Sequence, residues 1–248
     1  MERLYFEAPQ AVIDKIEQAN VDALLEMYGL GDLQAAPMPG AGRRFVKRLG
    51  DILMSALAIL VLAVPMLLVA LAIYIDDPGH AVFVQKRVGR GGKRFRFYKF
   101  RTMKESTPKY LSTMELDDPA QYVTRLGRFL RRFSLDELPQ LFNVLRGDMS
   151  LVGPRPLIAD EYEVHQMRAR LGVYNVRPGL TGLAQVNGRD FCSSGDKVRW
   201  DVKYVENFGP MQDIHILLST LPKVFGAKDV AEGPDAAHGH RADGEEEE

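Results

Sequence analysis

The residues best suited to chemistry lie between positions 131 and 156, in the sequence RRFSLDELPQLFNVLRGDMSLVGPRP. Here two adjacent acids, Asp136 and Glu137, are flanked by Arg131 on one side and Arg155 on the other. A carboxylate can attack phosphorus or ligate a hard cation, and planar guanidinium groups bind phosphate oxygens bidentately. This combination suits a magnesium-dependent reaction on a pyrophosphate substrate.

The same residues also fit a purely structural motif. Ser134 and Glu137 have the spacing of a capping box, in which the serine caps a helix and the glutamate reaches back to its amide. Pro139 would then lie in the first turn of a helix that starts at Asp136 or Glu137 and runs to Gly147. The two interpretations are compatible, because a helix N-terminus also binds anions and its dipole would help to keep both acids ionised.

The composition sets the outer limits of the fold. The 248 residues are 46% hydrophobic, which is enough for a sizeable core in one domain or two small ones. The single cysteine, Cys192, excludes an internal disulfide framework and indicates a reducing compartment. We expect four segments: an amphipathic appendage and linker at 1–42, a membrane helix at 43–80, a cytoplasmic catalytic domain at 81–225 and a disordered acidic tail at 226–248.

A long apolar segment predicts membrane association. Residues 52–75 are 24 consecutive residues without a charge, more than the ~20 that span a bilayer as a helix. Both flanks are basic, so the positive-inside rule disfavours moving either one across. Pro65, near the midpoint, disfavours a straight helix. We therefore expect a re-entrant hairpin bent at Pro65, with a proline-kinked spanning helix as the alternative.

A basic β-hairpin is expected after this segment. Residues 81–89 and 93–101 have strand patterns and are joined by a GRGG turn. Residues 43–101 contain twelve Lys and Arg against three acids, an excess that would attract anionic headgroups or a phosphorylated substrate, unless it is merely a solvated face. A Walker-type phosphate loop is excluded because Arg94 follows Lys93. The aromatic and basic alternation would suit nucleic acid, but a lipid-facing patch is simpler this close to a bilayer anchor.

Helical patterns account for most of the remaining chain. Residues 123–133 separate a cationic face from an apolar one, which suits a helix that brings charge to the acids or one at the membrane surface. Residues 176–188 are predicted to be extended, and an amphipathic helix follows them. A further helix at 211–225 carries an apolar stripe that we expect to pack in the core, although a lipid interface would produce the same pattern. The stripe consists of Ile214, Leu217, Leu218 and Leu221. The helical appendage at 1–42 is expected to pack against the main body or a partner.

Five segments, taken in order, carry a resemblance to a known family: KRLGDILMSALAILVLAVP, QKRVGRGGKRFRFYKFRTM, TRLGRFLRRFSLDELPQLFNVLRGDMSLVGPRP, RPGLTGLAQVNGR and DVKYVENF. Over about residues 43–225 the chain resembles the monotopic phosphoglycosyl transferases, the bacterial sugar transferase family that begins glycan assembly on a polyprenol carrier. Two departures are visible. Val64-Pro65 stands where members often have Ser-Pro, so Pro65 alone must carry the bend, and KFRTM replaces KFRSM.

The resemblance implies transfer of a sugar 1-phosphate from a UDP-sugar to polyprenol (undecaprenyl) phosphate, with release of UMP. It implies that Asp136 is the nucleophile of a covalent aspartyl-phosphosugar intermediate and that Glu137 is its partner acid, with Mg²⁺ bound at the pair. The implied nucleotide and phosphate ligands are Arg131 and, from the Pro-Arg-Pro element, Arg155 with Pro156. Lys99 and Arg101 match the KFR motif and are further candidate phosphate ligands.

The expected fold class is α/β, mainly helical with a small β-hairpin. A re-entrant membrane helix and amphipathic interfacial helices would surround a small catalytic domain on the cytoplasmic face of the bacterial inner membrane. The reaction would be the first step of exopolysaccharide, O-antigen or glycoconjugate assembly, with membrane lipids and downstream glycosyltransferases as partners and no nucleic acid. The alternative is a non-catalytic membrane-anchored scaffold for glycan-assembly enzymes, against which the intact acid pair argues.

Overall fold

The computed structural model describes residues 21–107, 119–187 and 193–225. Over these residues the chain is mostly helical and its strands form two two-stranded sheets, which confirms a mainly helical fold with a small β-hairpin. In chain order the elements are α2 (Val21–Met27), α3 (Ala41–Asp76), β1 (Val82–Val88), η1 (Arg90–Gly92), β2 (Arg94–Phe100), η3 (Pro119–Tyr122), α4 (Arg125–Arg132), η4 (Leu135–Glu137), α5 (Gln140–Arg146), β3 (Ser150–Val152), α6 (Tyr162–Arg170), η5 (Val173–Asn175), β4 (Gly179–Thr181), α7 (Leu183–Asn187), α8 (Ser194–Glu206) and α9 (Pro210–Phe225), where η denotes a 3-10 helix.

The longest element, α3, is a 36-residue helix that contains the whole apolar segment. In the part of the chain that the structure describes, it is the one helix long and apolar enough to cross a membrane, and only 11% of its most apolar stretch is buried. Its exposed side chains include Leu60, Val61, Leu67 and Leu68. An exposed apolar surface of this extent is typical of a membrane-associated helix.

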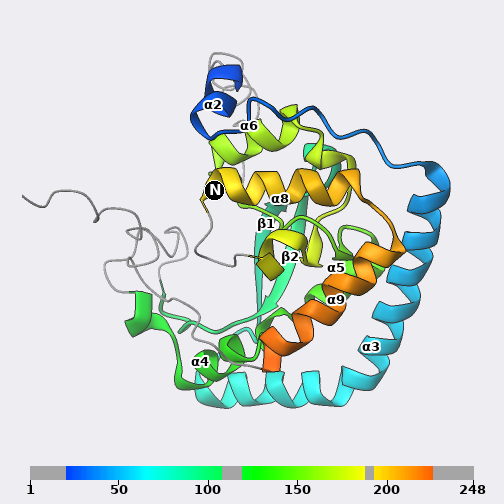
Figure 1. Cartoon of the computed structure of the whole chain (residues 1–248). Helices are drawn as coiled ribbons and strands as arrows, with labels where there is room; N and C mark the ends of the chain where they lie inside the picture. The colour runs from blue at the N-terminus through cyan, green and yellow to red at the C-terminus, as the bar shows by residue number, and fades with distance from the viewer. Residues whose placement is uncertain (1–20, 108–118, 188–192, 226–248) are drawn as a thin grey trace, which may run out of the picture.

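The two limbs of α3 pack against different groups of side chains. Figure 1 shows the helix running along one side of the molecule and then turning along its base. Ile59 packs against the main core, whereas Met66 and Ile73 belong to a second, smaller cluster. Leu62 contacts both clusters. The change of direction therefore falls close to Pro65, whose missing amide removes one helical hydrogen bond.

The basic β-hairpin is confirmed. β1 and β2 pair antiparallel over all seven residues of each strand. The side chain of Asn143 on α5 fastens β2 to the helix. Its Oδ1 accepts a hydrogen bond from the amide of Tyr98 at 3.1 Å, and its Nδ2 donates to the carbonyl of Arg96 at 2.6 Å. The hairpin is thus fixed to the segment that follows the acid pair.

The main core lies between α5, α6, α8 and the parallel pair β3 and β4. Where β3 leads into the Pro-Arg-Pro element, a Cβ on Gly153 would stand 2.5 Å from the carbonyl oxygen of Arg177. No residue but glycine fits such an approach. This close contact sets the direction in which the chain leaves β3 toward Arg155.

The N-terminal segment packs on the main body, as expected. Leu25, Leu30 and Ala36 are buried in the main core, and the amide of Ala36 donates to the carbonyl of Leu171 at 3.0 Å. The part of the predicted helix before Val21 lies outside the described residues. So do Cys192 and the predicted tail at 226–248.

The expectation of an extended segment at 176–188 is only partly right. The chain is extended as β4 over Gly179–Thr181, but Leu183–Asn187 form the short helix α7. A Cβ on Gly182 would stand 2.2 Å from the carbonyl oxygen of Gly153. Glycine thus lets β4 end tight against the neighbouring chain, where α7 begins.

The expected core packing of the α9 stripe is wrong for three of its four residues. Ile214, Leu218 and Leu221 are 52%, 61% and 52% exposed, and Leu217 is only partly buried. The residue that enters the core is Ile216, which is fully buried. Because α9 lies on the surface beside α3 (Figure 1), only one narrow face turns inward. The exposed stripe leaves the lipid interface as the remaining interpretation.

Candidate active site

The acid pair lies in η4, a single 3-10 turn between α4 and α5. Ser134, just before it, has φ 54° in the left-handed region, and within the described residues its side chain makes no capping hydrogen bond. The predicted capping box is therefore wrong. α5 begins at Gln140 with Pro139 as its N-cap, so the acids precede the helix because the tight connection from α4 displaces its start. The predicted end of the helix at Gly147, φ 97°, is confirmed.

Asp136 is buried, with 8% of its surface exposed. Burial raises the pKa of Asp136, and the nearby cations Lys99, Arg131 and Arg155 oppose this shift. A helix dipole is expected to help to keep this acid ionised, but burial has the larger effect and raises its pKa. A carboxylate already shielded from water has less hydration to lose when it attacks an electrophile.

Glu137 meets Arg155 across the site. Its Oε1 lies 3.5 Å from Nη1 of Arg155, whose side chain is half exposed. Burial raises the pKa of Glu137, and the guanidinium of Arg155 lowers it. The structure thus brings the Pro-Arg-Pro element to the acid pair, with one guanidinium both paired and accessible to a ligand.

Lys99 and Arg131 approach Asp136 from β2 and α4. Burial, and after it the charge of Arg131, lower the pKa of Lys99 to about 8, while Asp136 opposes the shift. Nε of Arg131 donates to Oγ1 of Thr102 at 2.9 Å, which ties the end of α4 to the end of the hairpin. Two cations from separate elements therefore act on the buried carboxylate.

Arg101, the other candidate from the KFR motif, is engaged elsewhere. Its buried guanidinium pairs with Glu105 and lies 3.3 Å from Oδ2 of Asp77, and it also donates to the carbonyl of Asp77. These contacts join the end of α3 to the end of β2. The structure does not place this guanidinium at the acid pair, and its role as a phosphate ligand stays a prediction.

Pro156 contacts Arg87, a residue that the sequence analysis did not single out. Pro156 is buried, and its carbonyl accepts a hydrogen bond from Nη1 of Arg87 at 3.0 Å. Burial, and after it the charge of Arg155, lower the pKa of Arg87 to about 10. In the sequence Arg87 is one basic residue among many, and only its place in the QKRVG segment could have distinguished it.

A buried ion pair between Arg168 and Asp201 supports the backbone of Arg155. Nη1 of Arg168 donates to the carbonyl of Arg155 at 2.8 Å, and Nη2 donates to Oδ2 of Asp201 at 2.5 Å. Arg168 is 3% exposed and Asp201 is 1% exposed. Sequence reasoning missed both, because charges on amphipathic helices usually face solvent. The one signal was that Asp201 opens the DVKYVENF segment.

The acid pair has the right donors for Mg²⁺. The described residues contain no cluster of three or more His, Cys, Asp and Glu side chains that could hold a metal unaided. Mg²⁺ commonly binds through one or two carboxylates and completes its coordination with substrate phosphates and water. Asp136 and Glu137 therefore fit an ion that binds together with a diphosphate.

The arrangement suits phosphoryl chemistry. Four cations surround one buried and one partly exposed carboxylate: Arg87 from β1, Lys99 from β2, Arg131 from α4 and Arg155 from the segment after β3. Preoriented cations attract a diphosphate and stabilise the charge that develops on its oxygens, while a carboxylate supplies a nucleophile.

Comparisons with known proteins agree with this chemistry. Residues 42–227 match the family described as bacterial sugar transferase. The chain is 38% identical over 192 residues to the exopolysaccharide production protein ExoY of Sinorhizobium fredii, covering 72% of this chain and 84% of that protein. It is 42% identical over 198 residues to the UDP-glucose:undecaprenyl-phosphate glucose-1-phosphate transferase of Caulobacter vibrioides, covering 76% and 73%.

Some similar proteins are much longer than the matched region. The chain is 41% identical over 196 residues to the undecaprenyl-phosphate galactose phosphotransferase of Salmonella typhimurium, covering 73% of this chain but 41% of that protein. The region that matches the family, residues 42–227, contains the acid pair, the hairpin and the Pro-Arg-Pro element.

Proposed function

Because this chain belongs to the bacterial sugar transferase family and is a phosphoglycosyl transferase, we propose that it transfers a sugar 1-phosphate from a UDP-sugar to undecaprenyl phosphate, releasing UMP. The reaction would begin the assembly of an exopolysaccharide, O-antigen or other glycoconjugate. Two of the relatives named above, those of Caulobacter vibrioides and Salmonella typhimurium, are named for transfer to undecaprenyl phosphate, which supports the choice of acceptor.

The observation that carries this proposal is the convergence of Asp136 and Glu137 with cations from separate parts of the chain. Lys99 and Arg131 act on Asp136, and Arg155 pairs with Glu137. A diphosphate brings two or more negative charges to a carboxylate nucleophile, so the reaction needs this many cations to offset the repulsion.

In the first step, a carboxylate oxygen of Asp136 attacks the phosphorus that carries the sugar. The bond between this phosphorus and the oxygen bridging to the uridine phosphate breaks, and UMP leaves with the bonding electrons. Arg155, half exposed beside Glu137, binds the diphosphate and orients it. Lys99 and Arg131 stabilise the charge on the phosphoryl oxygens.

In the second step, a phosphate oxygen of undecaprenyl phosphate attacks the same phosphorus. The bond to the Asp136 oxygen breaks, which regenerates the carboxylate and yields the undecaprenyl diphosphate sugar. Glu137 would hold Mg²⁺ with Asp136, and the ion would supply further neutralisation of phosphate charge. Chelation of Mg²⁺ should stop UMP release, and added Mg²⁺ should restore it.

The shape of α3 supports a re-entrant anchor on the cytoplasmic face of the inner membrane. Its limbs pack on two separate clusters on either side of Pro65, and both of its flanks are basic. Single cysteines introduced as Gly42→Cys and His80→Cys, with Cys192→Ser, test this topology by thiol labelling. Both should react only after the inner membrane is permeabilised. Labelling of one alone in intact cells would establish a spanning helix.

The central experiment uses the full-length protein in nanodiscs that contain undecaprenyl phosphate. A panel of UDP-sugars, assayed by UMP release, identifies the donor. Asp136→Asn should lower turnover by about a thousandfold or more, since the nucleophile acts as a unit with its partners. Asp160→Asn, an exposed aspartate outside the site, is the matched control.

Trapping the intermediate separates catalysis from scaffolding. With a labelled UDP-sugar and no acceptor, the wild-type protein should retain label, and mass spectrometry should locate it on Asp136. Normal turnover by Asp136→Asn would remove Asp136 from its assigned role. Absence of UMP release with every donor would leave the scaffold for glycan-assembly enzymes as the better account.

A further inference from the structure

A second cluster of cations lies at the N-terminal end of α3, apart from the acid pair. A small cavity there is lined by five cationic side chains and one carboxylate, Asp51. The cationic residues are Arg44, Lys47, Arg48, Arg90 and Arg177. They come from α3, from the hairpin turn and from the segment before β4. About 20 Å of strand separates this turn from Lys99.

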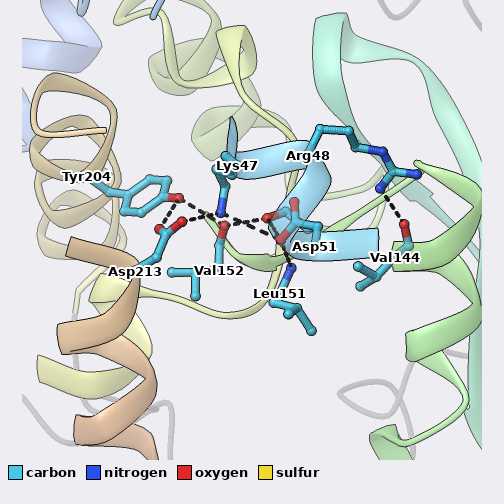
Figure 2. Close-up of polar contacts among 9 residues, drawn as sticks. Lys47, Arg48, Asp51, Val144, Leu151, Val152, Tyr204 and Asp213 are labelled. Atoms are coloured by element: carbon cyan, nitrogen blue, oxygen red, sulfur yellow. Dashed lines mark hydrogen bonds and ion pairs between the residues drawn. The ribbon is translucent and has the colours of Figure 1, made fainter. Parts of the chain in front are cut away.

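Three of these five cations already have partners. Nζ of Lys47 lies 2.6 Å from Oδ2 of Asp213 and 3.8 Å from Oδ1 of Asp51, as Figure 2 shows. Arg48 donates to the carbonyls of Val144 and Leu145 at 2.6 and 2.9 Å. Nε of Arg177 donates to the carbonyl of Gly147 at 2.8 Å.

Arg44 and Arg90 are different. Nε of Arg44 is buried, and within the described residues it has no hydrogen-bond partner. Burial lowers the pKa of Arg90, and the charges of Arg177 and Arg44 lower it further. Asp51, the one carboxylate among the residues that line the cavity, accepts hydrogen bonds from the hydroxyl of Ser150 and the amide of Leu151 on β3. Within the described residues no carboxylate pairs with Arg44 or Arg90, so their positive charge lacks a matching anion. Such a charge is costly unless a ligand supplies the anion.

The surroundings indicate which ligand this is. On the same turns of α3 the side chains of Phe45, Val46 and Leu49 are exposed, and the apolar segment starts at Ile52. Arginines at the start of a lipid-facing helix lie at the depth of the headgroups. Guanidinium groups bind phosphate oxygens bidentately.

We propose that Arg44 and Arg90 bind the phosphate of an anionic membrane lipid, with Arg48 and Arg177 adding positive potential behind them. The site is separate from the catalytic centre and does not depend on sugar transfer. Bound lipid would join α3 to the hairpin turn and so set the depth at which the catalytic domain sits on the bilayer.

Native mass spectrometry of the full-length protein in a non-ionic detergent tests this proposal without UDP-sugar. The protein is titrated with short-chain phosphatidylglycerol, with phosphatidylcholine of equal chain length and with inorganic phosphate. The double variant Arg44→Ala/Arg90→Ala should weaken phosphatidylglycerol binding by about tenfold or more, because charge-assisted hydrogen bonds are lost. Arg44→Lys, which keeps the charge but not the planar fork, should show part of this loss.

The matched control is Arg43→Ala/Arg94→Ala, which removes two exposed arginines from the same helix and the same hairpin. It should change binding less than twofold, and both double variants are compared by thermal unfolding. Equal loss in the control, or equal binding of phosphatidylglycerol and phosphatidylcholine by the wild-type protein, would overturn the proposal. Phosphate binding as tight as that of phosphatidylglycerol would identify a free-phosphate site and overturn the assignment to lipid. If the double variant fails to fold, Arg44→Lys against Arg43→Lys gives the same comparison.

Discussion

Nη2 of Arg168 and Oδ2 of Asp201 lie 2.5 Å apart in a buried ion pair whose arginine also donates to the backbone carbonyl of Arg155. The pair joins α6 to α8 and supports the segment that carries Arg155 to the acid pair. Arg168 and Asp201 are buried away from any ligand, and they position Arg155, which is half exposed at the acid pair.

Asp201→Asn should destabilise the protein by about 3–5 kcal/mol, because it leaves the Arg168 guanidinium buried without its counter-charge. Denaturant unfolding in detergent measures this loss. The double variant Arg168→Met/Asp201→Leu should recover most of the stability but not kcat/KM, since the carbonyl of Arg155 loses its donor. Full recovery of both would show that the pair has no positioning role.

Lys99 should set the alkaline limit of activity. Its pKa is lowered to about 8, so the cation that faces the phosphate is lost as the pH rises through about 8. The profile of kcat/KM against pH should fall there, and Lys99→Arg should move this limb to higher pH. Lys93→Arg, in the exposed turn, should leave the profile unchanged, and an unshifted limb in Lys99→Arg would assign it to another group.

Stability should depend on Lys99 in the opposite sense. The folded protein binds this proton more weakly than the unfolded chain, whose lysine titrates near 10.5. The contribution of Lys99 to stability should therefore rise between about pH 8 and 10.5 and be constant below that range. The difference between wild-type and Lys99→Met unfolding free energies across this interval measures it.

Gly127→Ala should disturb the site through the backbone. A Cβ there would stand 2.0 Å from the carbonyl oxygen of Thr102, the residue whose hydroxyl accepts from Arg131. We expect a loss of about 1–3 kcal/mol in stability and a fall in kcat/KM, because α4 must move away from the hairpin. Gly50→Ala is the control, since within the described residues no atom beyond its chain neighbours and its own helix backbone lies within 4 Å of its Cβ position, and it should gain about 0.5–1 kcal/mol. Wild-type activity in Gly127→Ala would contradict this account.

Arg87→Lys should lower kcat/KM by about tenfold although it keeps the charge, because lysine cannot reproduce the guanidinium contacts. The effect should fall mainly on KM for the UDP-sugar, since the Pro156 carbonyl that Arg87 holds adjoins Arg155. Steady-state kinetics of Arg87→Lys are compared with those of Arg125→Lys, which changes an exposed arginine on α4. An effect on kcat alone would indicate a different role.

Some features could be predicted because they depend on near neighbours in the chain. The hairpin follows from alternation around a glycine turn, and the end of α5 at Gly147 follows from a residue that tolerates positive φ. The start of α5 could not be predicted, because Ser134 adopts a left-handed conformation that the tight connection from α4 imposes. Local propensity favoured the capping box, and the geometry between two helices overruled it.

By itself the sequence determined which groups are available: two adjacent acids, an excess of basic residues and an uncharged stretch of 24 residues with a proline inside. Only the tertiary structure decided which of them meet. It buried Asp136 and raised its pKa, paired Arg101 with Asp77 and Glu105, and exposed the α9 stripe. Hydration and Coulomb energy depend on distances between residues far apart in the chain, and packing alone sets those distances.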